Sequence, residues 1–281
     1  MSEWREVELG ELVDGGFAEI RTGPFGTQLR AADYTPEGVP VLNVRNLGYG
    51  ALREGEIERV DSTVQKRLAG HLLAADDLVF GRKGAVDRHV LISAYQEGWM
   101  QGSDCIRLRL RPDSPISPEF LSKALLTPSH KRWMEAQCSH GATMASLNQD
   151  ILRRIVVSAP DRAAQERIAA TLGAFDDLID INERRIELLE DLARALYREW
   201  FVRFRFPGHE QIDLVDSELG PVPMGWDVRQ LSDIVTTQYG FTASATNERV
   251  GPRFLRGMDI NKRSVLRDRC QRDREVQFEY R

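Results

Sequence analysis

The sequence has only three cysteines, Cys105, Cys138 and Cys270, and they form neither a CxxC pair nor a metal-ligand spacing with the five histidines. An odd number of scattered cysteines suits a reducing compartment. No run approaches the roughly 18 apolar residues that span a bilayer, and the N-terminus lacks the apolar stretch of a signal peptide. We therefore expect a cytoplasmic protein without a metal site and without membrane contact.

Motifs of catalysis and cofactor binding are missing too. The sequence has no phosphate-binding Walker loop, no glycine loop that opens a helix, and no Asn/Asp-Pro-Pro-Tyr/Phe motif of amino-methyltransferases. Asp113, Glu119 and Lys123 have the wrong spacing for a nuclease and lie in a proline-rich stretch. The formal net charge of −5 gives no global basic signature, although a local basic face remains compatible with it. The sequence predicts a non-catalytic protein without cofactors; an enzyme with unrecognised catalytic residues is one alternative.

Residues 1–158 predict a mixed α and β domain, so the fold class is α+β. At 281 residues the chain is long enough for about two domains. Short apolar or alternating runs predict strands, and two segments predict helices, the first with proline in its first turn. The strands are expected at 39–44, 78–80, 89–93, 105–110 and 155–157, and the helices at 118–126 and 131–137.

Residues 159–206 predict one long spacer helix with a coiled-coil seam. Apolar residues recur at a 4-3 spacing for more than four heptads, which is typical of a coiled coil. The seam comprises Ile168, Leu172, Phe175, Ile179, Asn182, Ile186, Leu189, Ala193, Leu196 and Trp200. The single polar member, Asn182, is interpreted as a residue that sets register at some loss of stability. Because such a seam needs a partner helix, we expect either a second copy of the chain or a helix beyond residue 281.

The start of the first domain recurs after the helix. The apolar offsets that follow Trp4 repeat after Trp226, and the segment 41–47 is echoed at 254–260. A repeat of this long period indicates duplicated domains. We therefore expect a linker at 207–225 and, at 226–281, a second domain that is incomplete because the chain is C-terminally truncated. The aromatic residues that end the helix, Trp200, Phe201, Phe204 and Phe206, could pack against this second domain or form a docking surface.

Several segments, in order along the chain, resemble the specificity (S) subunits of type I restriction–modification systems. They are Gly-Pro-Phe-Gly at 23–26, Gly-Val-Pro-Val-Leu-Asn-Val at 38–44, 75–84, 140–147, Ala-Pro-x-x-x-x-Gln-Glu-x-Ile-Ala at 159–169, 196–204 and Pro-x-Gly-Trp at 223–226. One departure is Asp76-Asp77, where the family usually has Gly-Asp.

The resemblance implies two target recognition domains that read the two half-sites of a bipartite sequence in double-stranded DNA. It also implies two antiparallel spacer helices on which methyltransferase (M) subunits dock. The M subunits carry the adenine-N6 chemistry, restriction (R) subunits add cleavage, and the S subunit itself catalyses nothing. A homodimeric coiled-coil scaffold without DNA specificity is the alternative function.

Three segments are candidates for DNA contact. Basic side chains in a glycine-flanked loop can hold phosphates or read guanine, and amides can read adenine. For each segment a structural alternative stays open: a solvated turn, a glycine-dependent connection, or a turn built by asparagines. The candidates are Arg82, Lys83 and Arg88 in the loop 81–88; Thr22, Gly23, Phe25 and Gln28 in the loop 22–28; and Asn43, Arg45 and Asn46 at a strand end.

Overall fold

A computed structural model describes residues 4–53, 55–138 and 145–239. Three predicted segments lie wholly or partly outside the described residues. They are the repeat of 41–47 at 254–260, most of the second domain, and part of the segment 140–147. Contacts divide the chain into two units, residues 1–190 and 191–281. None of the helices in the described ranges is long and apolar enough to cross a membrane.

A five-stranded sheet forms the centre of the first unit. Its order is β2 (Ala18–Thr22), β10 (Cys105–Leu110), β7 (Leu78–Gly81), β8 (His89–Leu91) and β5 (Tyr49–Gly50). Neighbours run antiparallel except β5 and β8, which are parallel. The strands predicted at 78–80 and 105–110 are confirmed, and the one predicted at 89–93 ends two residues early, at Leu91.

A four-stranded sheet adjoins the first one in the order β3 (Tyr34–Thr35), β6 (Arg59–Val60), β4 (Val39–Leu42) and β9 (Met100–Gln101). The prediction of a strand over 39–44 was two residues too long. Asn43 caps a 3-10 turn at Val44–Asn46 instead, and its backbone N–H donates to the side chain of Asn46. A strand end and a capped turn use the same residue types, which is why the sequence did not separate them.

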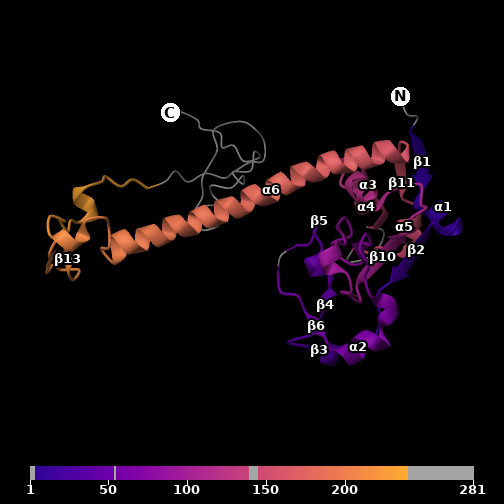
Figure 1. Ribbon diagram of the computed structural model, residues 1–281, viewed down its shortest axis with the longest axis horizontal. Coiled ribbons are helices and arrows are strands. Elements are labelled where there is room, and N and C mark those ends of the chain that lie inside the picture. Colours follow the sequence, from indigo (N-terminus) through magenta and orange to yellow (C-terminus); the bar gives the residue numbers. More distant parts are fainter. Residues whose placement is uncertain (1–3, 54, 139–144, 240–281) are drawn as a thin grey trace. The chain divides into compact units, whose positions relative to one another are not determined.

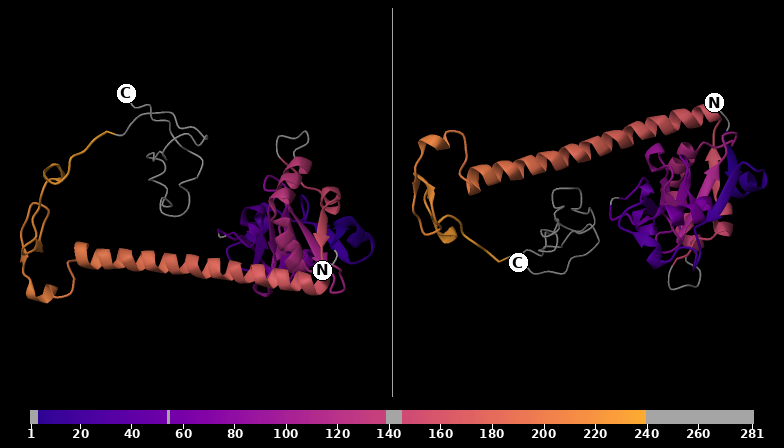
Figure 2. Two further views of the ribbon diagram at one scale, coloured as in Figure 1. Left: turned by 90° about the horizontal axis from the view of Figure 1, so that it is seen from above. Right: turned by 60° about the horizontal axis from the view of Figure 1, so that its bottom comes forward.

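Short helices and a terminal strand pair close the domain. The helices are α1 (Leu9–Asp14), α2 (Ser62–Arg67), α3 (Pro118–Leu125), α4 (Pro128–Cys138) and α5 (Gln149–Arg153). The strand β1 (Arg5–Glu8) pairs antiparallel with β11 (Val156–Ala159), so the first and last segments of the domain lie together. Figure 2 shows from two directions that residues 4–53, 55–138 and 145–159 form one body. Its main core is lined by fully buried side chains such as Leu9, Leu78, Ile106, Leu108, Ile116 and Leu121.

The helix α6 (Arg162–Tyr197) begins on this domain and continues beyond it as a single rod (Figure 1). Buried Gln165 fixes its first turn: the side chain accepts from the Ser117 N–H and donates to the carbonyls of Pro115 and Pro160. The long helix is therefore confirmed. It ends earlier than the predicted 206, because a π turn follows at Arg198–Val202 and Phe204 adopts a left-handed φ of 58°.

The predicted seam of α6 is exposed along most of its length. Ile168 packs partly against the domain core, whereas the apolar seam residues that follow it are more than a third exposed. The exposed fractions are 42% for Leu172, 60% for Phe175, 56% for Ile179, 41% for Ile186, 64% for Leu189, 42% for Leu196 and 37% for Trp200. An exposed apolar stripe with this 4-3 spacing is typical of a helix that packs against another helix.

The described part of the second unit is built around Trp226. The ring centres of Phe201, Phe204 and Phe206 lie 5.9, 5.4 and 6.0 Å from that of Trp226, so these three aromatic residues pack around it. A small hairpin of β12 (Leu214–Val215) and β13 (Val222–Pro223) precedes Trp226. Within residues 191–239, packing therefore accounts for three of the four aromatic residues that end the helix.

Candidate nucleic-acid interface

One edge of the five-stranded sheet collects both predicted DNA-binding loops. The strand β2 ends at Thr22 opposite Ile106 near the start of β10, and β7 ends at Gly81 opposite Cys105. The strand β8 begins at the same edge, where His89 pairs with both Phe80 and Tyr49. The loops 22–28 and 81–88 therefore leave the sheet side by side, together with β5. The sequence predicted each loop but gave no sign of their proximity.

Arg82 joins the two loops. Its guanidinium carbon lies over the ring of Phe25, 5.1 Å from the ring centre. Among the described residues no carboxylate lies within ion-pair distance of Arg82, so its charge and most of its donors are available. The loop around it is anchored by backbone bonds, since the Arg82 N–H donates to the Asp104 carbonyl and the Leu147 N–H donates to the Arg82 carbonyl. An anchored, uncompensated guanidinium at an edge is suited to bind an anion or a guanine.

A second cationic group surrounds Tyr49 at the same edge. The Arg88 guanidinium lies 5.6 Å and the Lys131 ammonium 4.7 Å from the Tyr49 ring centre. The Tyr49 hydroxyl donates to Asp87 across 2.8 Å, and Lys131 pairs with the same carboxylate at 3.1 Å. Arg88 itself has no ion-pair partner in the described ranges. The group around Tyr49 thus holds two cations and one carboxylate, which leaves an excess of positive charge.

The ionisation of this group follows from its contacts. Burial alone would raise the pKa of Asp87, but hydrogen bonds from Tyr49 and Lys131 outweigh it and lower that pKa. The hydrogen bonds to Tyr49 and Asp87 raise the pKa of Lys131. Asp87 is therefore a carboxylate and Lys131 an ammonium at neutral pH, so the pair stays charged.

At two positions of these loops the backbone lies so close to another backbone segment of the domain that only glycine fits. A Cβ on Gly23 would lie 2.0 Å from the carbonyl oxygen of Gly102, and one on Gly81 would lie 2.5 Å from the carbonyl oxygen of Ala85. Both glycines are buried. The reading that Gly23 contacts DNA is thus not supported by its position, and the reason for glycine there is contact with a neighbouring loop. A positive φ does apply at Gly84, at 74°.

The third predicted segment contributes little free side-chain surface. Asn46 is 1% exposed and its amide donates to the Glu56 carbonyl, so the prediction that it reads a base was wrong and the turn-forming alternative holds. Asn43 is half-buried and donates to Glu58 across 2.7 Å. Arg45 is exposed and pairs with the same carboxylate at 3.1 Å. Of the three side chains, only that of Arg45 is exposed to solvent.

The other predicted residues lie at the edge with partners of their own. Thr22 accepts a hydrogen bond from Gln149 at 2.8 Å, Gln28 accepts one from the Phe25 N–H, and Lys83 pairs with Asp104 at 3.2 Å. Sequence reasoning missed Tyr49 and Lys131, because they are 82 positions apart and carry no motif. We call the group Phe25, Tyr49, Arg82, Lys83, Arg88 and Lys131 the loop edge.

No three His, Cys, Asp or Glu side chains gather closely enough to hold a metal ion in the described segments. Buried Cys105 and Cys138 have thiol pKa values raised by burial, that of Cys138 to about 11. Both are therefore protonated at neutral pH and unsuited to nucleophilic attack.

Comparison with known proteins identifies the first domain and the helix. The profile of the type I restriction modification DNA specificity domain family matches residues 1–191. The type I restriction enzyme MjaIX specificity subunit of Methanocaldococcus jannaschii is 29% identical over 132 residues, which are 47% of this chain and 30% of that protein. The putative MjaX specificity subunit of the same organism is 23% identical over 263 residues, 91% of this chain and 59% of its own length.

A solved structure shares the fold. The S subunit of a type I restriction–modification system from M. genitalium superimposes with a TM-score of 0.51 at 18% identity, over 72% of this chain and 46% of that one. The chain matches 30%, 59% and 46% of the length of these three proteins. With a recognition-type domain, a long helix after it, and a family match over more than half its residues, the chain belongs to the type I restriction–modification DNA specificity family.

Proposed function

We propose that the first domain recognises one half-site of a DNA sequence through the loop edge, and that the chain itself is non-catalytic. The observation that carries this proposal is the meeting of Arg82 and Arg88, two guanidiniums without carboxylate partners in the described structure, at one edge of the sheet. Membership of the specificity family supports the choice of DNA over another polyanion.

Each residue of the loop edge has a chemical role in this proposal. Arg82 and Arg88 are held over aromatic rings, and the N–H donors in the plane of each guanidinium would pair with guanine O6 and N7. Lys83 and Lys131 are tethered to Asp104 and Asp87 and would supply phosphate contacts, which position the domain without reading sequence.

The exposed surface of α6 supports a docking role for the helix. Beside the seam, Leu178, Ile181, Leu188 and Leu192 form a second apolar flank, and they are 54%, 49%, 63% and 55% exposed. At 3.6 residues per turn this flank adjoins the seam, so the apolar surface is wider than one partner helix covers. We propose that the seam pairs with another helix and the flank receives a methyltransferase subunit, which carries the adenine chemistry. Restriction subunits would join that assembly.

A homodimeric scaffold without DNA specificity is the competing function, because an exposed seam alone would serve it equally. The two functions differ in salt dependence. Neutralising phosphates releases counterions, so the DNA affinity of a specificity subunit falls steeply as salt rises. A scaffold would retain DNA weakly or not at all.

The test measures binding of duplex DNA by the chain together with its methyltransferase subunits, between about 50 and 200 mM salt. We expect that replacing Lys131 with alanine lowers the salt slope by about one, as the loss of one phosphate contact does. Lys66→Ala on α2, an exposed cation outside the loop edge, is the matched control and should leave the slope unchanged. Equal slopes for both variants would refute the assignment of the loop edge as the DNA surface.

A further inference from the structure

The four cations of the loop edge fall into two kinds. Each lysine pairs with an aspartate: Lys131 with Asp87 at 3.1 Å, and Lys83 with Asp104 at 3.2 Å. The two arginines each lie over an aromatic ring, and neither has a carboxylate partner in the part of the chain that the structure describes. Four cations and two carboxylates leave a net charge of +2, and that charge lies on the guanidiniums.

Lysine and arginine contribute differently to DNA binding. An ammonium is a point charge that attracts any phosphate, whereas a guanidinium can also bond two acceptors on the edge of a guanine. Phosphates are the same in every sequence, so an uncompensated lysine strengthens binding to target and non-target DNA alike. A carboxylate beside each lysine lowers this sequence-independent attraction. The charge that remains belongs to the residues that are able to read a base.

The pair at Asp87 is held by a third side chain, that of Tyr49. The Asp87 side chain is only 14% exposed, and it accepts a hydrogen bond from the Tyr49 hydroxyl at 2.8 Å. The Lys131 ammonium donates to the same hydroxyl at 3.1 Å. Tyr49 therefore contacts both members of the pair and keeps the carboxylate beside the ammonium.

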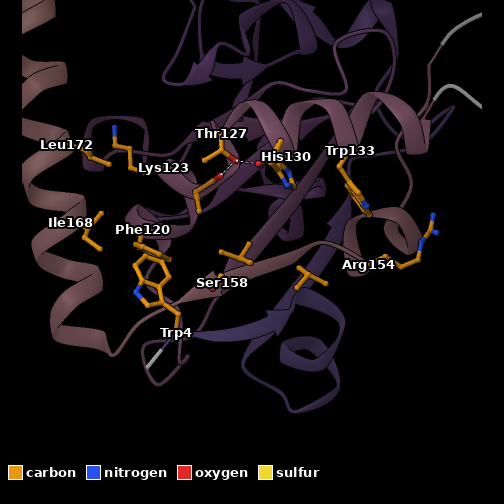
Figure 3. A pocket seen from close by; sticks show the side chains of 14 residues that line it. Trp4, Phe120, Lys123, Thr127, His130, Trp133, Arg154, Ser158, Ile168 and Leu172 are labelled. Carbon is orange, nitrogen blue, oxygen red and sulfur yellow. Dashed lines mark hydrogen bonds between the residues drawn. The ribbon is translucent and has the colours of Figure 1, made fainter. Parts of the chain in front are cut away.

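The packing of α4 fixes the backbone that carries Lys131. Met134 of the same helix is 2% exposed and lies in the main core. The rings of His130 and Trp133 stack with their centres 6.0 Å apart, and both side chains line a groove of about 530 Å³ beside α6 (Figure 3). Because α4 is held in these two ways, Lys131 extends from a rigid element and stays within reach of Asp87.

The pair at Asp104 joins two loops. The Asp104 carbonyl accepts the Arg82 N–H at 2.8 Å, and its carboxylate pairs with the following residue, Lys83. On the other side of this loop the Gly84 N–H donates to the Ala145 carbonyl at 3.0 Å. The side chains of this pair are 52% and 48% exposed, so salt screens it more than the pair at the half-buried carboxylate. The carboxylate of Asp104 therefore compensates its lysine less completely.

From these contacts we propose that Asp87 and Asp104 weaken sequence-independent DNA binding, so that less of the protein is held on non-target DNA and binding at the target depends on the arginines. The inference rests on the proposed function, because it takes the loop edge as the DNA surface. Neither carboxylate needs to touch DNA in this role. Each acts through the lysine whose charge it balances.

The test measures how the full chain, in complex with its methyltransferase subunits, binds a labelled duplex of alternating A·T base pairs. Such a duplex offers the arginines no guanine, so its affinity reports the sequence-independent attraction. Asp87→Asn keeps an oxygen acceptor for the neighbouring hydroxyl and removes one negative charge. Between about 50 and 200 mM salt the slope should become steeper by about 0.9, and at about 150 mM the duplex should bind about fivefold more tightly. Asp104→Asn should change both quantities in the same direction and by less.

Two further variants separate a local charge effect from other causes. Asp14→Asn is the matched control: it removes a carboxylate that pairs with Arg153 at 2.7 Å, ahead of the strand β2, whose other end meets the loop edge. It changes the overall charge equally and should leave the salt slope unchanged. Asp87→Glu keeps the charge and should restore the slope, which a purely steric role of Asp87 would not predict.

The outcomes distinguish failure of the inference from failure of the proposed function. An unchanged slope in both asparagine variants at the loop edge, while Lys131→Ala still lowers it, would overturn the inference and leave the proposed function intact. Unchanged slopes in all three variants would refute the loop edge as the DNA surface and the inference with it. An equal change with Asp14→Asn would mean that overall charge is responsible, which would also overturn the inference.

Discussion

Replacing Arg82 with alanine should remove a base-reading contact while leaving the domain folded. Its guanidinium makes one aromatic contact, with Phe25 at 5.1 Å, so the expected loss of unfolding free energy is about 0.5–1 kcal/mol. A bidentate contact to a base contributes about 1–3 kcal/mol of discrimination. At about 1.4 kcal/mol per tenfold change, that corresponds to roughly 5- to 150-fold weaker binding of the cognate site.

The assay is competition between the cognate duplex and duplexes with single base changes, using the chain in complex with its methyltransferase subunits. Arg82→Ala should lose discrimination at one base position only. Lys83→Ala is the comparison, since its ammonium is tied to Asp104 at 3.2 Å; it should weaken binding to all sequences alike. A uniform loss with Arg82→Ala, or no loss at all, would refute the reasoning that this guanidinium reads a base.

Three further predictions concern the folded domain. Gly23→Ala should lower the melting temperature and weaken DNA binding, because the added Cβ would lie 2.0 Å from the Gly102 carbonyl oxygen. Overpacking of this kind typically costs about 1–3 kcal/mol of unfolding free energy. An unchanged melting curve would contradict the close approach. Arg109→Ala should destabilise by about 1–3 kcal/mol in denaturant titration, since it leaves fully buried Asp77 without the guanidinium that binds it at 2.6 and 2.7 Å. Burial lowers the pKa of His89 to about 4, so the unfolded state binds the proton more readily, and this group should lower stability by about 3 kcal/mol as pH drops from about 6.5 to 4. His89→Gln should remove that contribution, whereas the one from His130, whose pKa burial also lowers to about 4, should remain.

Local patterns in the sequence predicted the elements whose period is visible in one stretch of chain. The alternation at 105–110 predicted the strand β10, and the 4-3 spacing from Ile168 predicted the helix α6. The alternation did not predict the burial of β10, because its first four residues, Arg107 included, are all buried. The prediction for α6 exceeded the helix at its end, where Phe204 takes a left-handed conformation. A periodic pattern records which side chains would face a partner, but not where the backbone leaves the helix.

The loop edge could not be predicted as a unit, because it depends on strand order. Arg82 and Phe25 are 57 positions apart in the sequence and meet only because β7 and β2 both pair with β10. The same applies to Tyr49 and Lys131, which no motif marks. Asn46 illustrates the opposite error: a residue type suited to reading adenine was predicted at the surface, and the structure uses it to close a buried turn.

The most direct test of the central claim is adenine-methylation mapping of host DNA. The methyltransferase subunits would be expressed with this chain, without it, and with the Arg82→Ala/Arg88→Ala variant. The account predicts a defined motif that appears only with the unmodified chain and is lost or relaxed with the variant; palindromic half-sites would match an antiparallel pair of identical chains. The same motif with all three, or no motif with the unmodified chain, would contradict the claim that the loop edge confers sequence specificity.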